Sequence, residues 1–190
     1  MTSGLLVTCY KNRQQSSFKA ITHELSSISN HRDGNDDTDI FAIEIKKEVR
    51  AELGKHNVKY VSFRNISNIY FIDNRTSLDA KTIAHKLMNR NINHTHKILA
   101  LDLFVEYNAA ALNAITGYLD EKIEGLDVSM RTFKIAFKQR CSNLCVKEIL
   151  FDMILCRMKR FGVDLTRPDI TIHVQVIKNS IGVCLGTLSS

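Results

Sequence analysis

Positive charge gathers in one stretch of this chain, between residues 131 and 167. The stretch has nine basic residues against three acidic ones, so its excess of +6 equals the formal net charge of the whole chain. Its basic residues are Arg131, Lys134, Lys138, Arg140, Lys147, Arg157, Lys159, Arg160 and Arg167. A cationic surface this dense is typical of proteins that bind a polyanion. Its clustering at the expected ends of strands and a helix favours that interpretation over a plain solvated surface.

The residue types that could catalyse a reaction do not form a recognisable cluster. Cys141 and Cys145 have the spacing of two zinc ligands, but no second pair accompanies them, so two cysteines near a helix start are favoured. His94 and His96 could hold a metal from one strand face, yet no third ligand is evident. The glycines never form the GxG of a nucleotide-binding turn. We therefore expect a binding protein without catalytic residues, metal or cofactor, and an enzyme acting through the Cys141 region is the competing class.

An acidic segment at 30–39 imitates a calcium-binding loop. Carboxylate and amide side chains occupy the ligand positions from Asp33 to Glu44, but Thr38 takes the place of the glycine that makes the sharp turn. A polar surface loop that leads into a helix is favoured. The segment could serve either as a contact for a partner or as a spacer, and the sequence leaves both roles open.

Composition limits the class of protein. The chain has 190 residues, of which 44% are hydrophobic and 24% charged, which suits one globular domain or two small ones. No apolar run approaches the roughly 20 residues that span a bilayer, and the N-terminus lacks the basic region of a secretory signal. We expect an intracellular protein of the nucleus, nucleolus or cytoplasm, with its five cysteines reduced and mostly buried.

Hydrophobic periodicity predicts a small α/β unit in the C-terminal half. Phe133, Ile135 and Phe137 alternate with polar residues as in a half-buried strand, and residues 144–160 have the composition of a helix. A second alternating strand follows Pro168. A turn at Asn179-Ser180 then leads into a third strand through Leu185.

The N-terminal half reads as strand, helices, two strands, helix and strand, the order of a ferredoxin-like domain. The expected elements are a strand at 4–9, helices at 15–29 and 40–53, strands at 58–63 and 66–72, a helix from Ser77 or Asp79 to Asn89, and a strand at 97–103. Arg64-Asn65 should join the two middle strands and Asp73-Asn74 should end the second. A further helix at 106–124 should then pack on the C-terminal unit.

The C-terminal segments resemble the THUMP domain, an RNA-binding module of tRNA-modifying proteins. TFKIAFKQR matches the pattern F-x-I-x-x-K-x-R, and VDLTRPDITIHVQVIKNSIGVCL matches V-D-L-x-x-P-D-x-x-I-x-V-x-V followed by G-V-x-L. The three pieces occur in the family's order and at its separations. The resemblance implies an α/β (α+β) protein with a ferredoxin-like domain at about 1–103 and a THUMP domain at about 104–190.

The N-terminal segments resemble one group of THUMP proteins, the Tan-type adaptors of the tRNA cytidine acetyltransferase. GLLVTC is close to their G-x-L-x-T-C strand, and DDTDIFAIEIKKEVRAEL to their acidic loop and I-x-x-E-(L/V) helix. LDAKTIAHKLM is close to D-x-x-x-(I/L)-x-H-K-(I/L). The chain departs at HTHKILALDLF, which lacks the arginines and proline of the family's R-x-x-x-R-x-x-P strand, so RNA contacts of that strand do not carry over.

The resemblance implies a non-catalytic adaptor that holds the acceptor stem and 3′ end of tRNA. It would present a D-arm cytidine to a separate RNA cytidine acetyltransferase, which would carry acetyl-CoA, ATP and the chemistry. The alternative is an RNA-binding subunit of another tRNA-modifying complex, such as a methyltransferase. The expected RNA contacts are Lys134, Lys138, Arg140, Arg157, Lys159, Arg160, Arg167 and Lys178. Two other roles are open for Arg157: its aliphatic stem could pack along the helix with the charged group in water, or its guanidinium could cap the helix carbonyls.

Overall fold

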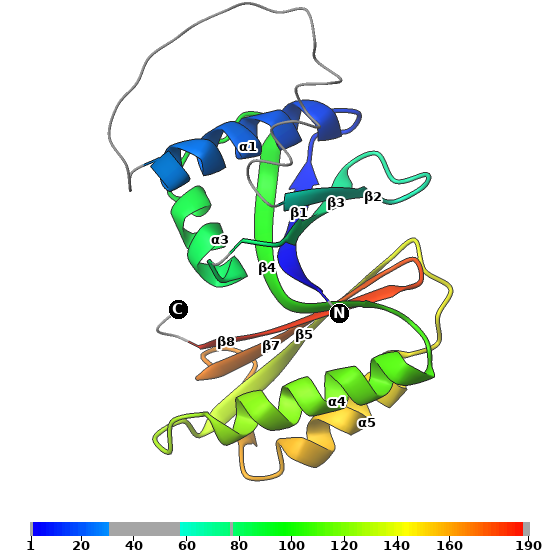
Figure 1. The fold of residues 1–190 in the computed structure, drawn as a ribbon. Coiled ribbons are helices and arrows are strands. Elements are labelled where there is room, and N and C mark those ends of the chain that lie inside the picture. Colours follow the sequence, from blue (N-terminus) through cyan, green and yellow to red (C-terminus); the bar gives the residue numbers. More distant parts are fainter. Residues whose placement is uncertain (1, 31–57, 77, 188–190) are drawn as a thin grey trace, which may run out of the picture. The chain divides into compact units, whose positions relative to one another are not determined.

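The structure is a computed structural model that describes residues 2–30, 58–76 and 78–187. The chain divides into two compact units, one formed by Ser3–Ala100 and the other by Leu101–Ser190 with residues 1–2. Both units combine helices with a sheet, as the fold class predicted from the sequence requires (Figure 1). The acidic segment at 30–39 and the expected helix at 40–53 fall outside the described residues, apart from Asn30 at the end of the first helix.

The N-terminal unit has the ferredoxin-like order of elements. Its described elements are β1 (Thr2–Cys9), α1 (Gln14–Asn30), β2 (Val58–Ser62), β3 (Ile69–Asn74), α3 (Ala80–Met88) and the first part of β4 (Thr95–Glu106). Its strands lie in the order β2-β3-β1-β4, and β3 is antiparallel to both β1 and β2. This arrangement confirms the ferredoxin-like prediction.

Helices α1 and α3 cover one face of this sheet (Figure 1). Leu5 and Val7 of β1 and Ile72 of β3 point toward Ile21 of α1 and Leu87 of α3, because alternate strand residues share a face. The core also holds a polar tie: the Ser17 hydroxyl lies 2.8 Å from the buried Tyr70 hydroxyl and 2.7 Å from that of Thr95. The hydroxyl pairs satisfy polar groups that would be costly to bury alone.

The predicted break at Asp73-Asn74 is wrong, because both residues belong to β3. Asp73 is buried opposite Gly4 and Lys59, and Arg75 donates a 3.1 Å hydrogen bond to its carboxylate. Asn74 ends the strand instead, since its side-chain amide donates to the Leu78 carbonyl. Asp79 then caps α3 by accepting from the amides of residues 81 and 82, as the sequence predicted.

The C-terminal unit wraps two helices over one face of a mixed sheet (Figure 1). After β4 come α4 (Ala109–Glu124), β5 (Thr132–Arg140), α5 (Lys147–Arg157), β6 (Gly162–Val163), β7 (Ile170–Ile177) and β8 (Ser180–Thr187). The strands lie in the order β4-β8-β7-β5-β6. β5 and β7 are parallel and α5 makes the crossover between them, whereas β8 is antiparallel to β7 and β4.

Alternating residues of β7 build the core of this unit. Ile172 and Val174 are fully buried and pack in one cluster with Ile115 of α4 and Leu150 and Ile154 of α5. The period-two pattern after Pro168 therefore predicted the correct face. Its turn was placed one residue late, because Ile177 pairs with Ser180 and Lys178-Asn179 form the loop.

Two helices of this unit are shorter than the sequence suggested. α5 begins at Lys147 rather than 144, because the Gln139 side chain holds the carbonyls of Ser142 and Leu144 in a loop. α4 begins at Ala109, after the Asn108 side chain caps the Ala111 amide. Residue 106 still belongs to β4.

A half-buried tyrosine, Tyr118, ties α4 to two strands of the same unit. The Tyr118 hydroxyl donates to Asp102 of β4 at 2.6 Å and accepts from the Leu185 amide of β8 at 3.0 Å. Burial and the neighbouring carboxylate raise the pKa of Tyr118, so the phenol stays a donor.

Among the described residues, no helix has the length and apolar character needed to cross a membrane.

Candidate nucleic-acid interface

β5 carries cations on the face opposite its two helices. Phe133 packs into the helix-covered core, so Lys134, Lys138 and Arg140 lie on the other face by strand alternation. The parallel register sets Lys138 beside Gln175 and Arg140 beside Ile177. Lys138 is exposed, whereas Lys134 and Arg140 are half-buried. One strand thus presents three of the cations predicted from the sequence.

The predicted cations separate into two groups at opposite ends of β5. Lys138 and Arg140 lie at its C-terminal end, and the Lys178 amide donates a 3.2 Å hydrogen bond to the Arg140 carbonyl. Lys178 adopts a left-handed φ of 52° in the β7–β8 turn, which sets its side chain at this end. We call Lys138, Arg140 and Lys178 the hairpin-end cluster.

The remaining predicted cations lie at the N-terminal end of β5. α5 runs back along the sheet, and the Gly162 amide after it donates to the Arg131 carbonyl at 2.8 Å. We call this set the helix-end cluster, and its members are Lys134, Arg157, Lys159, Arg160 and Arg167. Along β5, Lys134 of the helix-end cluster and Lys138 of the hairpin-end cluster are four residues apart, or about 13 Å at the usual rise of a strand.

Two arginines of the helix-end cluster hold the fold together. Arg157 binds Asp120 of α4 at 2.6 Å and donates to the Met153 carbonyl at 3.0 Å. Arg160 donates to the Ile123 carbonyl at 2.8 Å, and its guanidinium lies 4.8 Å from the centre of the Phe161 ring. Both cap the C-terminal turn of a helix, which is the capping role that the sequence left open for Arg157.

The aspartates of the V-D-L-x-x-P-D motif shape the loop that carries Arg167. Asp164 accepts from the Thr166 and Arg167 amides at 2.8 and 3.0 Å. Asp169 accepts from the Arg131 and Thr132 amides at 2.8 and 2.9 Å. These hydrogen bonds lower the pKa of both carboxyls, because they favour the charged form. The motif is therefore a structural clamp that leaves Arg167 exposed.

One cation near the hairpin-end cluster, Lys147, was not among the RNA contacts expected from the sequence. Lys147 begins α5, which follows β5 after a short loop, and its ammonium lies 5.6 Å from the centre of the Phe151 ring. Val146 at the N-cap makes no side-chain hydrogen bond, and the carboxylate of Glu148 in the first turn partly offsets the positive charge of the helix N-terminus. The signal was present in the sequence, since Lys147 follows an apolar residue that cannot cap a helix.

Burial shapes the chemistry of the hairpin end. Desolvation lowers the pKa of the Arg140 guanidinium from its ordinary value. A half-buried cation interacts with a phosphate in a medium of lower dielectric than water, which strengthens the attraction. Guanidinium and ammonium groups together provide both bidentate and point-charge contacts to phosphate oxygens.

The cysteines do not follow their prediction. Cys9 and Cys184 are buried, but Cys141, Cys145 and Cys156 are exposed, and all five are free thiols. Cys141 and Cys145 fall in the loop after β5 instead of inside regular elements, and Cys156 lies on the outer face of α5. Within the described ranges, no three His, Cys, Asp or Glu side chains are grouped as metal ligands.

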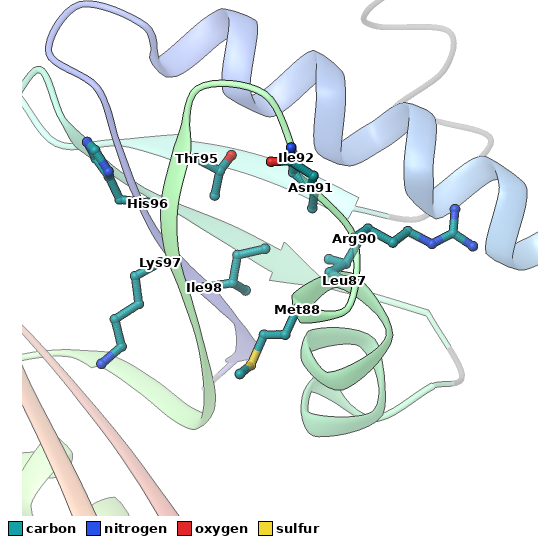
Figure 2. A pocket seen from close by; sticks show the side chains of 9 residues that line it. All are labelled: Leu87, Met88, Arg90, Asn91, Ile92, Thr95, His96, Lys97 and Ile98. Atoms are coloured by element: carbon teal, nitrogen blue, oxygen red, sulfur yellow. The ribbon is translucent and has the colours of Figure 1, made fainter.

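A hollow of about 300 Å³ lies in the N-terminal unit, between the end of α3 and the start of β4 (Figure 2). Leu87, Ile92 and Ile98 give it an apolar lining, and Arg90 at its rim is paired with Glu24 of α1. His96 and Lys97 of β4 also line it (Figure 2). Its lining residues include no carboxylate and no thiol.

Comparison with protein families identifies the C-terminal unit. The model of the THUMP domain matches residues 112–185, which run from α4 to β8. The chain therefore contains a THUMP domain, as the resemblance implied. A search of curated protein sequences finds no significant match.

Solved structures share the fold over both units. The crystal structure of PH1313 from Pyrococcus horikoshii Ot3 superposes with a TM-score of 0.57 at 14% identity, covering 97% of this chain and 54% of that one. A 4-thiouridine synthetase solved with RNA and bound ATP gives a TM-score of 0.54 at 14% identity, covering 98% of this chain and 41% of that one. The chain thus corresponds to about half or less of each of these proteins. At this identity the likeness shows a common fold.

Proposed function

We propose that this chain binds tRNA and serves tRNA modification. The observation that carries the proposal is the hairpin-end cluster on a THUMP domain: Lys138, Arg140 and Lys178 gather at one end of two parallel strands. Lys147 at the start of α5 adds a further cation there, next to Glu148. Helical RNA is recognised mainly through phosphates and 2′-hydroxyls, which long cationic side chains reach. The RNA bound to the 4-thiouridine synthetase of the same fold supports this assignment.

Within that role we infer a non-catalytic adaptor for a separate RNA cytidine acetyltransferase. The support is the resemblance of GLLVTC, LDAKTIAHKLM and the acidic segment to the Tan-type adaptors. The acceptor stem and 3′ end of tRNA would lie on the THUMP unit, and the partner enzyme would supply acetyl-CoA and the reaction. A subunit of a different tRNA-modifying complex, such as a methyltransferase, is the second candidate. The partner that co-purifies with the chain distinguishes the two.

Binding across a salt series tests RNA recognition. The chain should prefer tRNA and an acceptor-stem minihelix with a free 3′ end over duplex DNA of matched charge, with a steep loss of affinity as salt rises. Equal and weak binding to all three nucleic acids would refute recognition of structured RNA.

The placement of the site is tested by Lys138→Glu combined with Arg140→Glu. The double variant should weaken tRNA binding and reduce the slope of log affinity against log salt by roughly two, about one for each lost phosphate contact. Lys19→Glu with Lys86→Glu is the matched control, because both lysines are exposed on helices of the N-terminal unit. An unchanged slope in the first variant would place the RNA elsewhere.

A further inference from the structure

Three loops of the N-terminal unit come together at one end of its sheet. The Asn12 amide donates to the Ser67 carbonyl at 3.0 Å, which joins the loop after β1 to the β2–β3 loop. The Tyr10 amide donates to the His94 carbonyl at 3.1 Å, which joins it to the loop before β4. We call residues 10–13, 63–68 and 91–96 the loop end of this unit.

The loop end is cationic. Lys11, Arg13 and Arg64 are exposed there, and Lys97 follows on β4. The three segments contain no Asp or Glu. α1 begins at Gln14, directly after Arg13, so the positive end of a 17-residue helix lies at the same place. Charge of one sign on short loops creates a local field that attracts an anion.

An aromatic group stands among these cations. The Tyr10 side chain is 54% exposed although it is a large ring, and the His96 ring lies 3.9 Å from it between centroids. His94 meets the same tyrosine edge-on at 6.5 Å. Both histidines are exposed as well. An exposed aromatic surface bordered by cations is the arrangement that stacks unpaired nucleobases and holds their phosphates.

The local backbone fixes this surface in position. Asn12, Asn65 and His94 each adopt a left-handed φ of 63°, one in each loop. The Gln14 side-chain amide donates to the carbonyls of Ile66 and Ile69 at 2.8 and 2.6 Å. The Tyr10 ring is therefore carried on loops that are hydrogen-bonded to one another, which lowers the entropy lost when a ligand binds.

We propose that the loop end is a second RNA-binding surface, where Tyr10 and His96 stack an unpaired nucleotide and Lys11, Arg13 and Arg64 bind its flanking phosphates. The inference deepens the proposed function by giving the N-terminal unit a role in it. It concerns an unpaired nucleotide held by the N-terminal unit, whereas the hairpin-end cluster lies on the THUMP unit, which is proposed to hold the acceptor stem and 3′ end.

The test compares Tyr10→Ala with Tyr10→Phe in the full chain, using an unstructured RNA ten-mer and whole tRNA. Tyr10→Ala should weaken ten-mer binding about 5- to 160-fold, the range for loss of one stacked base, whereas Tyr10→Phe should bind as the wild type does. Lys11→Glu with Arg64→Glu should also weaken the ten-mer and lower its salt slope. Equal affinity of the Ala and Phe variants would overturn the proposal.

The same experiment keeps the two RNA surfaces apart. The Lys138→Glu and Arg140→Glu variant should retain ten-mer binding while it loses tRNA affinity. If the wild-type chain does not bind the ten-mer, the loop-end proposal is overturned. The affinity of the wild-type chain for tRNA then still tests the proposed function. Ten-mer binding that falls equally in the hairpin-end and loop-end variants would also refute a separate surface.

Discussion

Single carboxylates carry much of the local order of the THUMP domain. Asp169 accepts hydrogen bonds from two amides and from the Thr132 hydroxyl, and these bonds lower its pKa. A carboxyl whose pKa is lower in the folded state stabilises the fold above its unfolded pKa, near 3.9, and loses that contribution as pH falls through the folded value. The acid side of the stability profile should therefore depend on Asp169.

Asp169→Asn should reduce the loss of unfolding free energy as the pH falls below about 4, the unfolded pKa of an aspartate. The neutral amide does not titrate, so the variant is less stable at pH 7 but approaches the wild type in acid. Urea unfolding followed by circular dichroism across this range measures the difference. Asp152→Asn is the control, because the Asp152 side chain is exposed on α5. If Asp169→Asn loses stability with falling pH as steeply as the wild type does, Asp169 is not the source of the acid dependence.

The Tyr118 hydroxyl makes a second prediction at the residue scale. Tyr118→Phe removes the donor to Asp102 and the acceptor of the Leu185 amide, both partly buried. The free energy of unfolding should fall by about 1–3 kcal/mol, because two hydrogen bonds of about 0.5–1.5 kcal/mol each are lost. Urea titration measures it, and tRNA affinity under folding conditions should not change. A loss below about 0.5 kcal/mol would show that water replaces the hydroxyl at no cost.

Helix packing decides which cations are available to a ligand. Arg157 bridges α5 to Asp120 of α4 while it caps its own helix, so its charge is already used within the protein. The neighbouring Lys159 is exposed at the same end of α5 and has no such bonds among the hydrogen bonds and ion pairs that the structure gives. The two residues look equivalent in sequence, but the tertiary contacts separate them.

Arg157→Lys should lower stability by about 0.5–1 kcal/mol, because a lysine cannot make the paired contact with Asp120. The salt slope of tRNA binding should stay unchanged, since the charge is kept. Thermal unfolding and the salt series measure the two effects. Lys159→Arg, which replaces lysine by arginine instead of the reverse, is the control. A changed salt slope for Arg157→Lys would assign Arg157 to the RNA site.

Element boundaries show where periodicity is informative and where it fails. Alternation in β5 and β7 predicted both strands and their buried faces, because each has one face in the core. The end of α5, the β7–β8 turn and the extension of β3 through Asp73 were missed. Each depends on a contact distant in sequence or on a side-chain cap, which periodicity does not report.

At the scale of the whole molecule, the adaptor proposal predicts a defined kinetic phenotype. In a reconstituted reaction with the acetyltransferase, acetyl-CoA and ATP, Lys138→Glu with Arg140→Glu should raise the KM for tRNA. The KM for acetyl-CoA should stay constant, because the chain is proposed to hold only the RNA. Acetylcytidine formation measures both values. A fall in kcat at saturating tRNA, with unchanged KM, would instead indicate a role in the chemical step.

The sequence by itself determined the α/β class, the ferredoxin-like order and the THUMP domain, because these follow from periodicity and from local motifs that need no distant partner. It also located the cationic stretch. Only the tertiary structure decided that this stretch forms two clusters, since the crossover through α5 carries Arg157 and Arg160 to the opposite end of β5 from Arg140. The loop end likewise exists only in the fold, because Tyr10 and His96 are brought together by adjacent strands.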